Sequence, residues 1–179
     1  NTDTVHGKLA KVRFRSGANS DDLLDFQVFM SPGDVWTAAV TAGADGVAQL
    51  TTADGTCTLP ALAKGVPQSF VTDRLSDKAG EIAAQTREGY VEIFNMADIT
   101  NTAAADLFDL IKHPANGAPK CADTATNTAW TAINTDNTVA GYGAAAIGLT
   151  PPTTGLMANW TIINVPKALS WNGDATAIE

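Results

Sequence analysis

The chain has 179 residues, of which 45% are hydrophobic and 17% charged, and its formal net charge at pH 7 is −8. The apolar content favours a folded over a disordered chain, and the acidic balance argues against nucleic acid or an anionic membrane as a partner. No run of about 20 apolar residues is present, so the sequence predicts no membrane-spanning helix. The length suits one domain with a full core, and we expect residues 1–179 to be a single domain.

The clearest pattern is a pair of alternating apolar and polar runs between Leu9 and Val40. Apolar side chains alternate with basic ones over residues 10–15, and residues 24–30 alternate in a similar way. A period of two residues is typical of a strand with one buried and one solvated face. The polar residues 16–20 between the runs predict the turn of a hairpin.

Further elements follow between residues 31 and 96. After a turn at residues 31–34, Val35–Val40 and Val47–Thr52 have the composition of strands. Residues 59–80 are irregular because Pro and Gly interrupt them, and Glu81–Arg87 predicts a single helical turn. Gly89–Met96 alternates again and predicts a strand.

The last part of the chain holds the best helix signal. Ala103–His113 follows N-cap candidates, carries apolar residues at helical spacing and is stopped by a proline. Residues 115–155 are rich in Ala, Thr, Asn, Gly and Pro and predict loops with one short strand at Trp130–Ile133. Asn159–Val165 and Ala168–Trp171 are two more strand candidates.

These elements amount to about eight short strands with frequent turns and one helix, a pattern typical of all-β folds. The predicted fold class is therefore mainly β: an antiparallel β-sandwich of the immunoglobulin or jelly-roll type with one short helix. Strand alternation predicts buried side chains at Phe14, Phe26, Val28, Val91 and Ile93. It predicts exposed side chains at Lys11, Arg13 and Glu92.

The chain has two cysteines, Cys57 and Cys121, and no C-x-x-C motif. Two histidines cannot complete a Cys/His zinc site at the usual spacings. We expect a Cys57–Cys121 disulfide, which would be worth about 4 kcal/mol in the chain-entropy model and would indicate an oxidising compartment. The alternative is two unrelated buried thiols.

Nothing in the sequence forms a recognisable catalytic, cofactor or metal motif, so we expect no enzyme, no cofactor and no metal. His113 ends the expected helix, where a cation suits the dipole, and His6 is expected to face solvent. Residues 141–146 match G-x-G-x-x-A, but the polar residues before them do not form the strand that a dinucleotide site needs. The acidic groups at residues 21–25, 54 and 134–136 lack the spacing of a calcium loop, and solvated turns are the better interpretation.

Two other residue sets leave alternatives open. Lys11, Arg13 and Arg15 form a basic stripe that could meet acidic surface on a neighbouring copy or be matched within the chain, with Glu92 as one partner. The four tryptophans could bind sugars or fill the core. They are Trp36, Trp130, Trp160 and Trp171.

Five stretches in order resemble a group of bacterial cell-surface or secreted proteins, mostly proteobacterial. They are LAKVRFRSGANSDDLLDFQVFMSPGDVWTA (9–38), LTTADGTCTLPAL (50–62), TREGYVEIFNMADI (86–99), IKHPANGAPKCA (111–122) and NWTIINVPKALSWNGDATAI (159–178). The resemblance implies a secreted, sandwich-like surface protein and assigns no catalytic residues, because none are established for the group. It also suggests that the cysteines of TCT and PKC are linked. In that group a segment with its own strands precedes the first block, so we expect this chain to be a fragment lacking terminal strands.

The function predicted from the sequence is that of a non-catalytic structural protein at the cell surface. It would assemble with copies of itself into an S-layer, appendage or extracellular filament through strand edges such as Val35–Val40 and Trp160–Val165, which carry no charge. The alternative is a secreted β-sandwich module that binds carbohydrate or another surface ligand. A hydrolytic enzyme is the third possibility and would need polar residues converging from distant segments.

Overall fold

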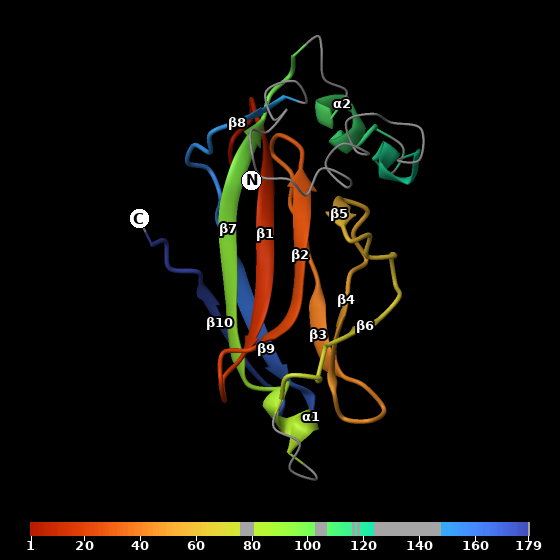
Figure 1. The fold of residues 1–179 in the computed structure, drawn as a ribbon, viewed down its shortest axis with the longest axis vertical. Helices are drawn as coiled ribbons and strands as arrows, with labels where there is room; N and C mark the ends of the chain where they lie inside the picture. Colours follow the sequence, from red (N-terminus) through yellow and green to blue (C-terminus); the bar gives the residue numbers. More distant parts are fainter. Residues whose placement is uncertain (76–80, 103–106, 116, 118, 124–147, 179) are drawn as a thin grey trace.

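The computed structural model describes residues 1–75, 81–102, 107–115, 117, 119–123 and 148–178. Its main feature is a long five-stranded antiparallel sheet with the strand order β5-β2-β1-β7-β8 (Figure 1). The strands of this sheet are β1 (Gly7–Ser16), β2 (Asp22–Met30), β5 (Cys57–Leu59), β7 (Gly89–Ile99) and β8 (Leu149–Thr150).

The hairpin of β1 and β2 forms the centre of the sheet, as the alternating runs predict. The register places Val12 opposite Phe26 and Ala10 opposite Val28, so these apolar side chains share one face. The turn includes Ser20 in the left-handed region, with a φ of 61°. The backbone N–H of Gly17 donates to the Glu88 carbonyl at 2.8 Å, which holds the turn beside the start of β7.

A second, three-stranded sheet covers part of that face. It consists of β3 (Ala39–Ala42), β4 (Ala48–Thr51) and β6 (Gln68–Ser69), and in Figure 1 it lies beyond β2, on the side away from β7. The core between the two sheets includes Ala10, Val12, Phe26, Val28, Met30, Ala48, Leu50 and Phe70. The ring of Trp36 lies 5.3 Å from that of Phe26, between centroids.

On the opposite face of the long sheet, the described residues form a core at one end. There α2 (Leu107–Ile111) packs four apolar side chains on the sheet, next to the short 3-10 helix η1 (Lys120–Asp123). This second core includes Leu9, Phe29, Ile99, Leu107, Phe108, Leu110, Ile111 and Leu149. The expected disulfide between Cys57 and Cys121 is present, with Cα atoms 5.5 Å apart, and it ties β5 to η1.

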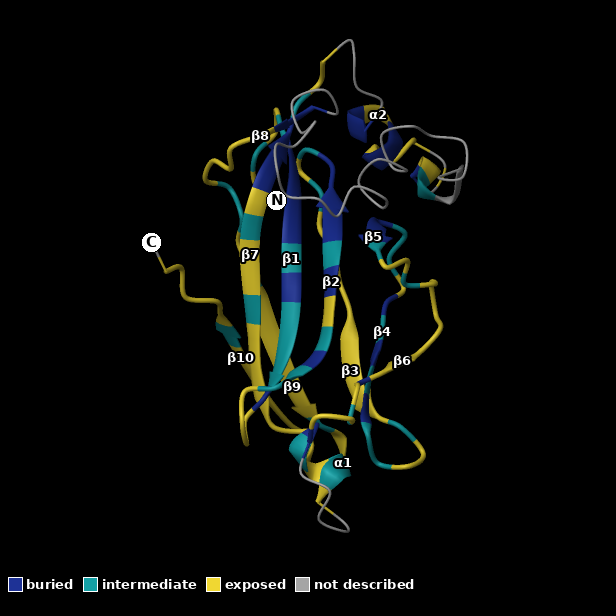
Figure 2. Ribbon diagram, in the orientation of Figure 1, coloured by how far each residue is buried: buried dark blue, intermediate teal, exposed yellow. Residues whose placement is uncertain are grey.

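A hairpin of β9 (Asn159–Asn164) and β10 (Leu169–Asp174) forms a sheet of its own. The 3-10 turn η3 (Val165–Lys167) joins its strands, and the Asn164 side chain accepts a hydrogen bond from the Lys167 backbone N–H at 3.2 Å. Figure 2 shows this hairpin almost entirely exposed. The short helix α1 (Ile82–Gln85) precedes β7, where the sequence predicts a helical turn.

The mainly β, antiparallel fold class is confirmed, with few and short helices and a long sheet that curls into a half-barrel. The immunoglobulin or jelly-roll topology stays a prediction. The helix expected over Ala103–His113 is present as α2, with residues 103–106 outside the described part of the chain. The strand expected at Trp130–Ile133 also lies outside it.

The strand prediction for Val35–Val40 is wrong over its first four residues, because β3 begins only at Ala39. The Asp34 carboxylate accepts the backbone N–H groups of Ser31 and Val35 at 3.3 and 2.9 Å. This local turn stands in place of the expected strand start, and the Trp36 ring packs against Phe26.

The burial predictions hold on β2 and fail on β7. Phe26 and Val28 are buried, but Val91 and Ile93 are 50% and 44% exposed. The register places these two opposite Phe14 and Val12, on the same face of the sheet, but the core on that face contains no residue of β7. Phe14 is half-buried where we expected burial, and Lys11, Arg13 and Glu92 are half-buried where we expected exposure.

Candidate functional site

Two exposed apolar patches are the most unusual feature of the surface. The β7 patch consists of Tyr90, Val91, Ile93, Phe94 and Met96, whose side chains are divided between the two faces of the strand. The hairpin patch consists of Trp160, Ile162, Ile163, Leu169 and Trp171. Each of these side chains is between 39% and 67% exposed. Exposed apolar side chains gathered on neighbouring strand positions are typical of interaction surfaces, whereas scattered single ones are ordinary.

The hairpin patch is concentrated on one face. Trp160 and Ile162 are two residues apart on β9, so their side chains point to the same face. The register with β10 places Leu169 and Trp171 on that face as well. A Cβ atom built on Gly173 would lie 2.7 Å from the Trp160 ring, so the glycine allows this ring to lie flat across the hairpin.

The patches lie on strands with unpaired edges. Residues 89–94 of β7 pair with β1 on one side, and among the residues that the structure describes no strand pairs with them on the other. In the same part of the chain, β9 pairs only with β10, and β3 only with β4. An unpaired strand edge presents N–H and C=O groups that can pair with another chain.

The charged side chains on the long sheet are matched within the chain. Arg13 donates two hydrogen bonds from its terminal nitrogen to both oxygens of Asp22 at 2.9 Å, and Arg15 binds Glu92 at 2.7 Å. Lys11 pairs with Asp25 at 2.7 Å. The hydrogen bond from Arg13 lowers the pKa of Asp22 below its usual range. The basic stripe is therefore neutralised inside the molecule.

A buried polar cluster lies where β1, β7 and the segment after β8 meet. Lys8 is fully buried, and its Nζ lies 2.5 Å from Oδ1 of Asp98, which is directly opposite on β7. Thr153 Oγ1 lies 2.9 Å from the same nitrogen and donates to Asp98 Oδ2 at 2.5 Å. The Thr153 backbone N–H donates to Asp98 Oδ1 at 3.2 Å.

Asp3 and His6 border this cluster. Asp3 Oδ2 lies 3.4 Å from Lys8 Nζ and 2.9 Å from His6 Nδ1. Hydrogen bonds from the backbone N–H groups of His6 and Val5 hold the pKa of Asp3 well below its usual value. Burial raises the pKa of Asp98, but the hydrogen bonds from Lys8 and Thr153 together outweigh it, so the net shift is downward.

Asp3, His6 and Asp98 also place their ligand atoms within 4.8 Å of one another, a spacing that a metal ion could use. The Lys8 ammonium already contacts both carboxylates and supplies the positive charge that a metal would bring. We therefore interpret the cluster as a centre built around Lys8. One signal for this cluster is present in the sequence, because Lys8 is in phase with Ala10 and Val12 of the buried face.

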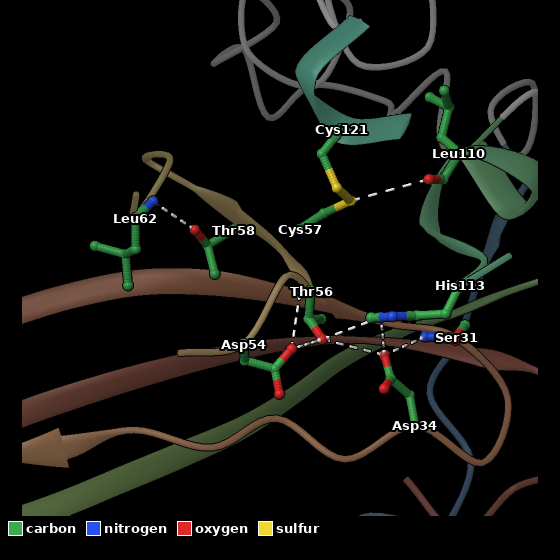
Figure 3. Close-up of a disulfide and its surroundings, with 10 residues drawn as sticks. All are labelled: Ser31, Asp34, Asp54, Thr56, Cys57, Thr58, Leu62, Leu110, His113 and Cys121. Carbon is green, nitrogen blue, oxygen red and sulfur yellow. Dashed lines mark hydrogen bonds and ion pairs between the residues drawn. A yellow bond between two sulfur atoms is a disulfide. The ribbon is translucent and has the colours of Figure 1, made fainter. Parts of the chain in front are cut away.

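The other histidine, His113, lies beside the disulfide (Figure 3). Its Nε2 contacts Asp34 Oδ2 and Thr56 Oγ1, each at 3.3 Å. In a nucleophile–His–Asp triad the acid and the nucleophile bind different ring nitrogens, so this arrangement is not a triad. His113 and Asp34 border an open depression of about 530 Å³ between the β2–β3 turn and α2.

The remaining sequence candidates have ordinary partners or lie outside the described residues. Asp21 accepts from Asn19, and Asp54 accepts from the hydroxyl of Thr56 at 2.7 Å, as expected for turn residues. Glu88 is exposed. The G-x-G-x-x-A motif at residues 141–146, the acidic group at 134–136 and Trp130 fall in the part of the chain that is not described.

No protein-family model matches this chain, and neither the curated proteins nor the solved structures contain a significant match to it. Among the described residues, no helix has the length and apolar content needed to cross a membrane.

Proposed function

We propose that this chain is a non-catalytic structural subunit that joins other copies of itself into an S-layer, appendage or filament outside the cell. The observation that carries the proposal is the edge of β7 at residues 89–94, which pairs with no strand in the described part of the chain and whose side chains are mostly apolar and exposed. Strand addition to such an edge gives affinity through main-chain hydrogen bonds and specificity through alternate side chains.

The edge carries few of the groups that normally prevent association. Residues 89–94 include no lysine or proline, and their one charged side chain, Glu92, is held by Arg15. β9 contains no charged residue. Edge strands that do not associate usually carry lysine, proline or an inward charge, so these edges favour pairing.

The occupant of the β7 edge is a second copy of this chain. The hairpin supplies an apolar strand whose outer edge is free of a partner strand in the described structure. Because β7 and β9 are different surfaces, contact of one with the other joins subunits head to tail. A head-to-tail contact of this kind generates an open polymer when the rotation between successive copies does not close into a ring.

The disulfide supports an extracellular location, because such bonds persist mainly in oxidising compartments. Its position also suits an assembly subunit, since it fixes the cap formed by α2 and η1 to the edge strand β5.

The oligomeric state tests the proposal directly. Light scattering and sedimentation over a wide range of protein concentrations should show growing assemblies, and electron microscopy should show sheets or filaments. A chain that stays monomeric at the highest concentration in native-like buffer contradicts the proposal.

One observation favours a second candidate, a carbohydrate-binding module. Trp160 and Trp171 are about half exposed on the same face of the hairpin, and aromatic rings of this kind can stack on sugar rings. A monomeric protein whose tryptophan fluorescence changes on titration with oligosaccharides would support this function over assembly.

A further inference from the structure

The Lys8–Asp98 pair combines full burial with close approach. Lys8 has no exposed surface and Asp98 is 2% exposed, and the two residues lie opposite each other on the adjacent strands β1 and β7. Their reacting atoms are held together by the sheet itself, so no loop has to close to bring the amine to the carboxyl group. Positioning of this kind makes a reaction between two groups effectively unimolecular.

We infer that Lys8 Nζ and Asp98 Cγ become joined by an intramolecular amide bond that crosslinks β1 to β7. A buried ion pair pays a desolvation penalty for two charges. An amide in the same place carries no charge, and Thr153 can still hydrogen-bond to its carbonyl oxygen. The crosslink forms inside one subunit and does not depend on assembly.

The first step is a proton transfer within the pair. The Lys8 ammonium gives one proton through the Thr153 hydroxyl to Oδ2 of Asp98, which leaves a neutral amine beside a neutral carboxylic acid. Burial raises the pKa of Asp98, but the hydrogen bonds from Lys8 and Thr153 keep it low, so the neutral pair is the minor form, and the attack proceeds from it. The amine lone pair then attacks Cγ, and the N–Cγ bond forms.

The second step is the loss of water. The oxygen that accumulates negative charge is Oδ1, which the Thr153 backbone N–H contacts at 3.2 Å. Thr153 Oγ1 lies between the attacking nitrogen, at 2.9 Å, and Oδ2, at 2.5 Å, so it can relay the second proton from nitrogen to Oδ2. The Cγ–Oδ2 bond breaks, and Oδ2 leaves as water with both protons. No oxidant or reductant is required.

Asp3 is the other group placed to move this proton. Its Oδ2 lies 3.4 Å from Lys8 Nζ and is held in place by His6. A carboxylate beside the attacking amine can accept a proton during attack and return it to the leaving oxygen. The four side chains therefore take separate roles: Lys8 as nucleophile, Asp98 as electrophile, and Thr153 and Asp3 as proton carriers.

Mass spectrometry of the reduced, denatured chain tests the inference. The folded protein should be lighter than its reduced sequence by the mass of one water molecule, and protease digestion should yield a branched peptide that joins the Lys8 and Asp98 fragments. An intact mass equal to that of the reduced sequence, after long incubation of the folded protein, overturns the inference and leaves a non-covalent ion pair.

Two arginine variants give a matched comparison on the same strand. Lys8→Arg keeps the positive charge but replaces the amine nucleophile, so the water loss should disappear. Lys11→Arg changes a different lysine, a half-exposed one that pairs with Asp25. It leaves Lys8 and Asp98 unchanged, so the water loss should remain. A Lys8→Arg chain that still loses one water contradicts the assignment. If this variant does not fold, the branched peptide of the unmodified chain decides the question.

Thr153→Val tests whether the Thr153 hydroxyl assists the reaction. It removes the hydroxyl relay while Lys8 and Asp98 stay in place, so the crosslinked fraction should rise more slowly with time after refolding. An unchanged rate for both Thr153→Val and Asp3→Asn would contradict the roles given to these residues.

Discussion

Val12 and Ile93 lie opposite each other on neighbouring strands, yet Val12 is 5% exposed and Ile93 is 44% exposed. Both side chains point to the same face of the long sheet, because residues paired across strands share a face. The core beneath β1 and β2 includes Val12 but no residue of β7. The exposed apolar side chains between residues 90 and 96 of β7 are therefore available to another molecule.

This asymmetry predicts very different costs for two truncations. Phe26→Ala should lower the free energy of unfolding by about 3–5 kcal/mol, because it leaves a cavity at a fully buried site. Ile93→Ala should cost at most about 1 kcal/mol, since its side chain already meets solvent. Urea denaturation of dilute, monomeric protein measures both values. Equal losses of stability in the two variants would contradict the burial described here.

The disulfide predicts a second stability difference. Replacing both Cys57 and Cys121 with serine should lower the free energy of unfolding by about 4 kcal/mol, because the unfolded chain loses a long covalent loop. Reduction of the unmodified protein should produce a similar loss. Titration of free thiols in the unreduced native protein provides the control, and two reactive thiols there would show that the bond is absent.

Much of the fold was predictable because strand alternation is a local property. Residues 10–15, 24–30 and 89–96 alternate with a period of two, and all three segments lie within strands. The disulfide was also predictable, since two cysteines without metal-site spacing leave few other roles. These features require no knowledge of which segments meet in space.

The missed features depend on long-range packing. Alternation identifies the side chains that share a face, but not whether another layer covers it, and the prediction for Val91 and Ile93 failed for that reason. Lys8 was overlooked because its partners, Asp98 and Thr153, lie far along the chain. Only its phase with Ala10 and Val12 indicated a buried position.

The ion pair between Arg13 and Asp22 predicts a pH dependence of stability. Its hydrogen bond with Arg13 lowers the pKa of Asp22 in the folded state, so the unfolded chain takes up this proton first as the pH falls. The stabilisation is fully present above the unfolded pKa of about 3.9 and is lost as the pH falls through the lower folded pKa. Stability between about pH 5 and pH 2 should therefore fall less steeply in Asp22→Asn than in the unmodified chain.

Denaturation curves over that pH range provide the measurement, with Asp73→Asn as the control. Asp73 is an exposed carboxylate, so its replacement changes the net charge by the same amount. Parallel pH profiles for Asp22→Asn and the unmodified protein would contradict the role given to the Arg13–Asp22 pair.

The apolar patches predict where a charge should block assembly. Val91→Lys on β7 and Ile162→Lys on β9 each place a lysine on an exposed apolar strand position, where a bound copy would have to desolvate the charge. Each should raise the concentration needed for assembly by on the order of tenfold or more, which corresponds to about 1.4 kcal/mol per tenfold step. Val66→Lys introduces the same residue at a loop position that is 58% exposed and serves as the matched control.

Light scattering of the three variants at equal concentration compares their assembly, and circular dichroism checks that each remains folded. Assembly that is reduced equally by all three would point to net charge as the cause, whereas assembly unaffected by Val91→Lys and Ile162→Lys would rule out β7 and the hairpin as the contact surfaces.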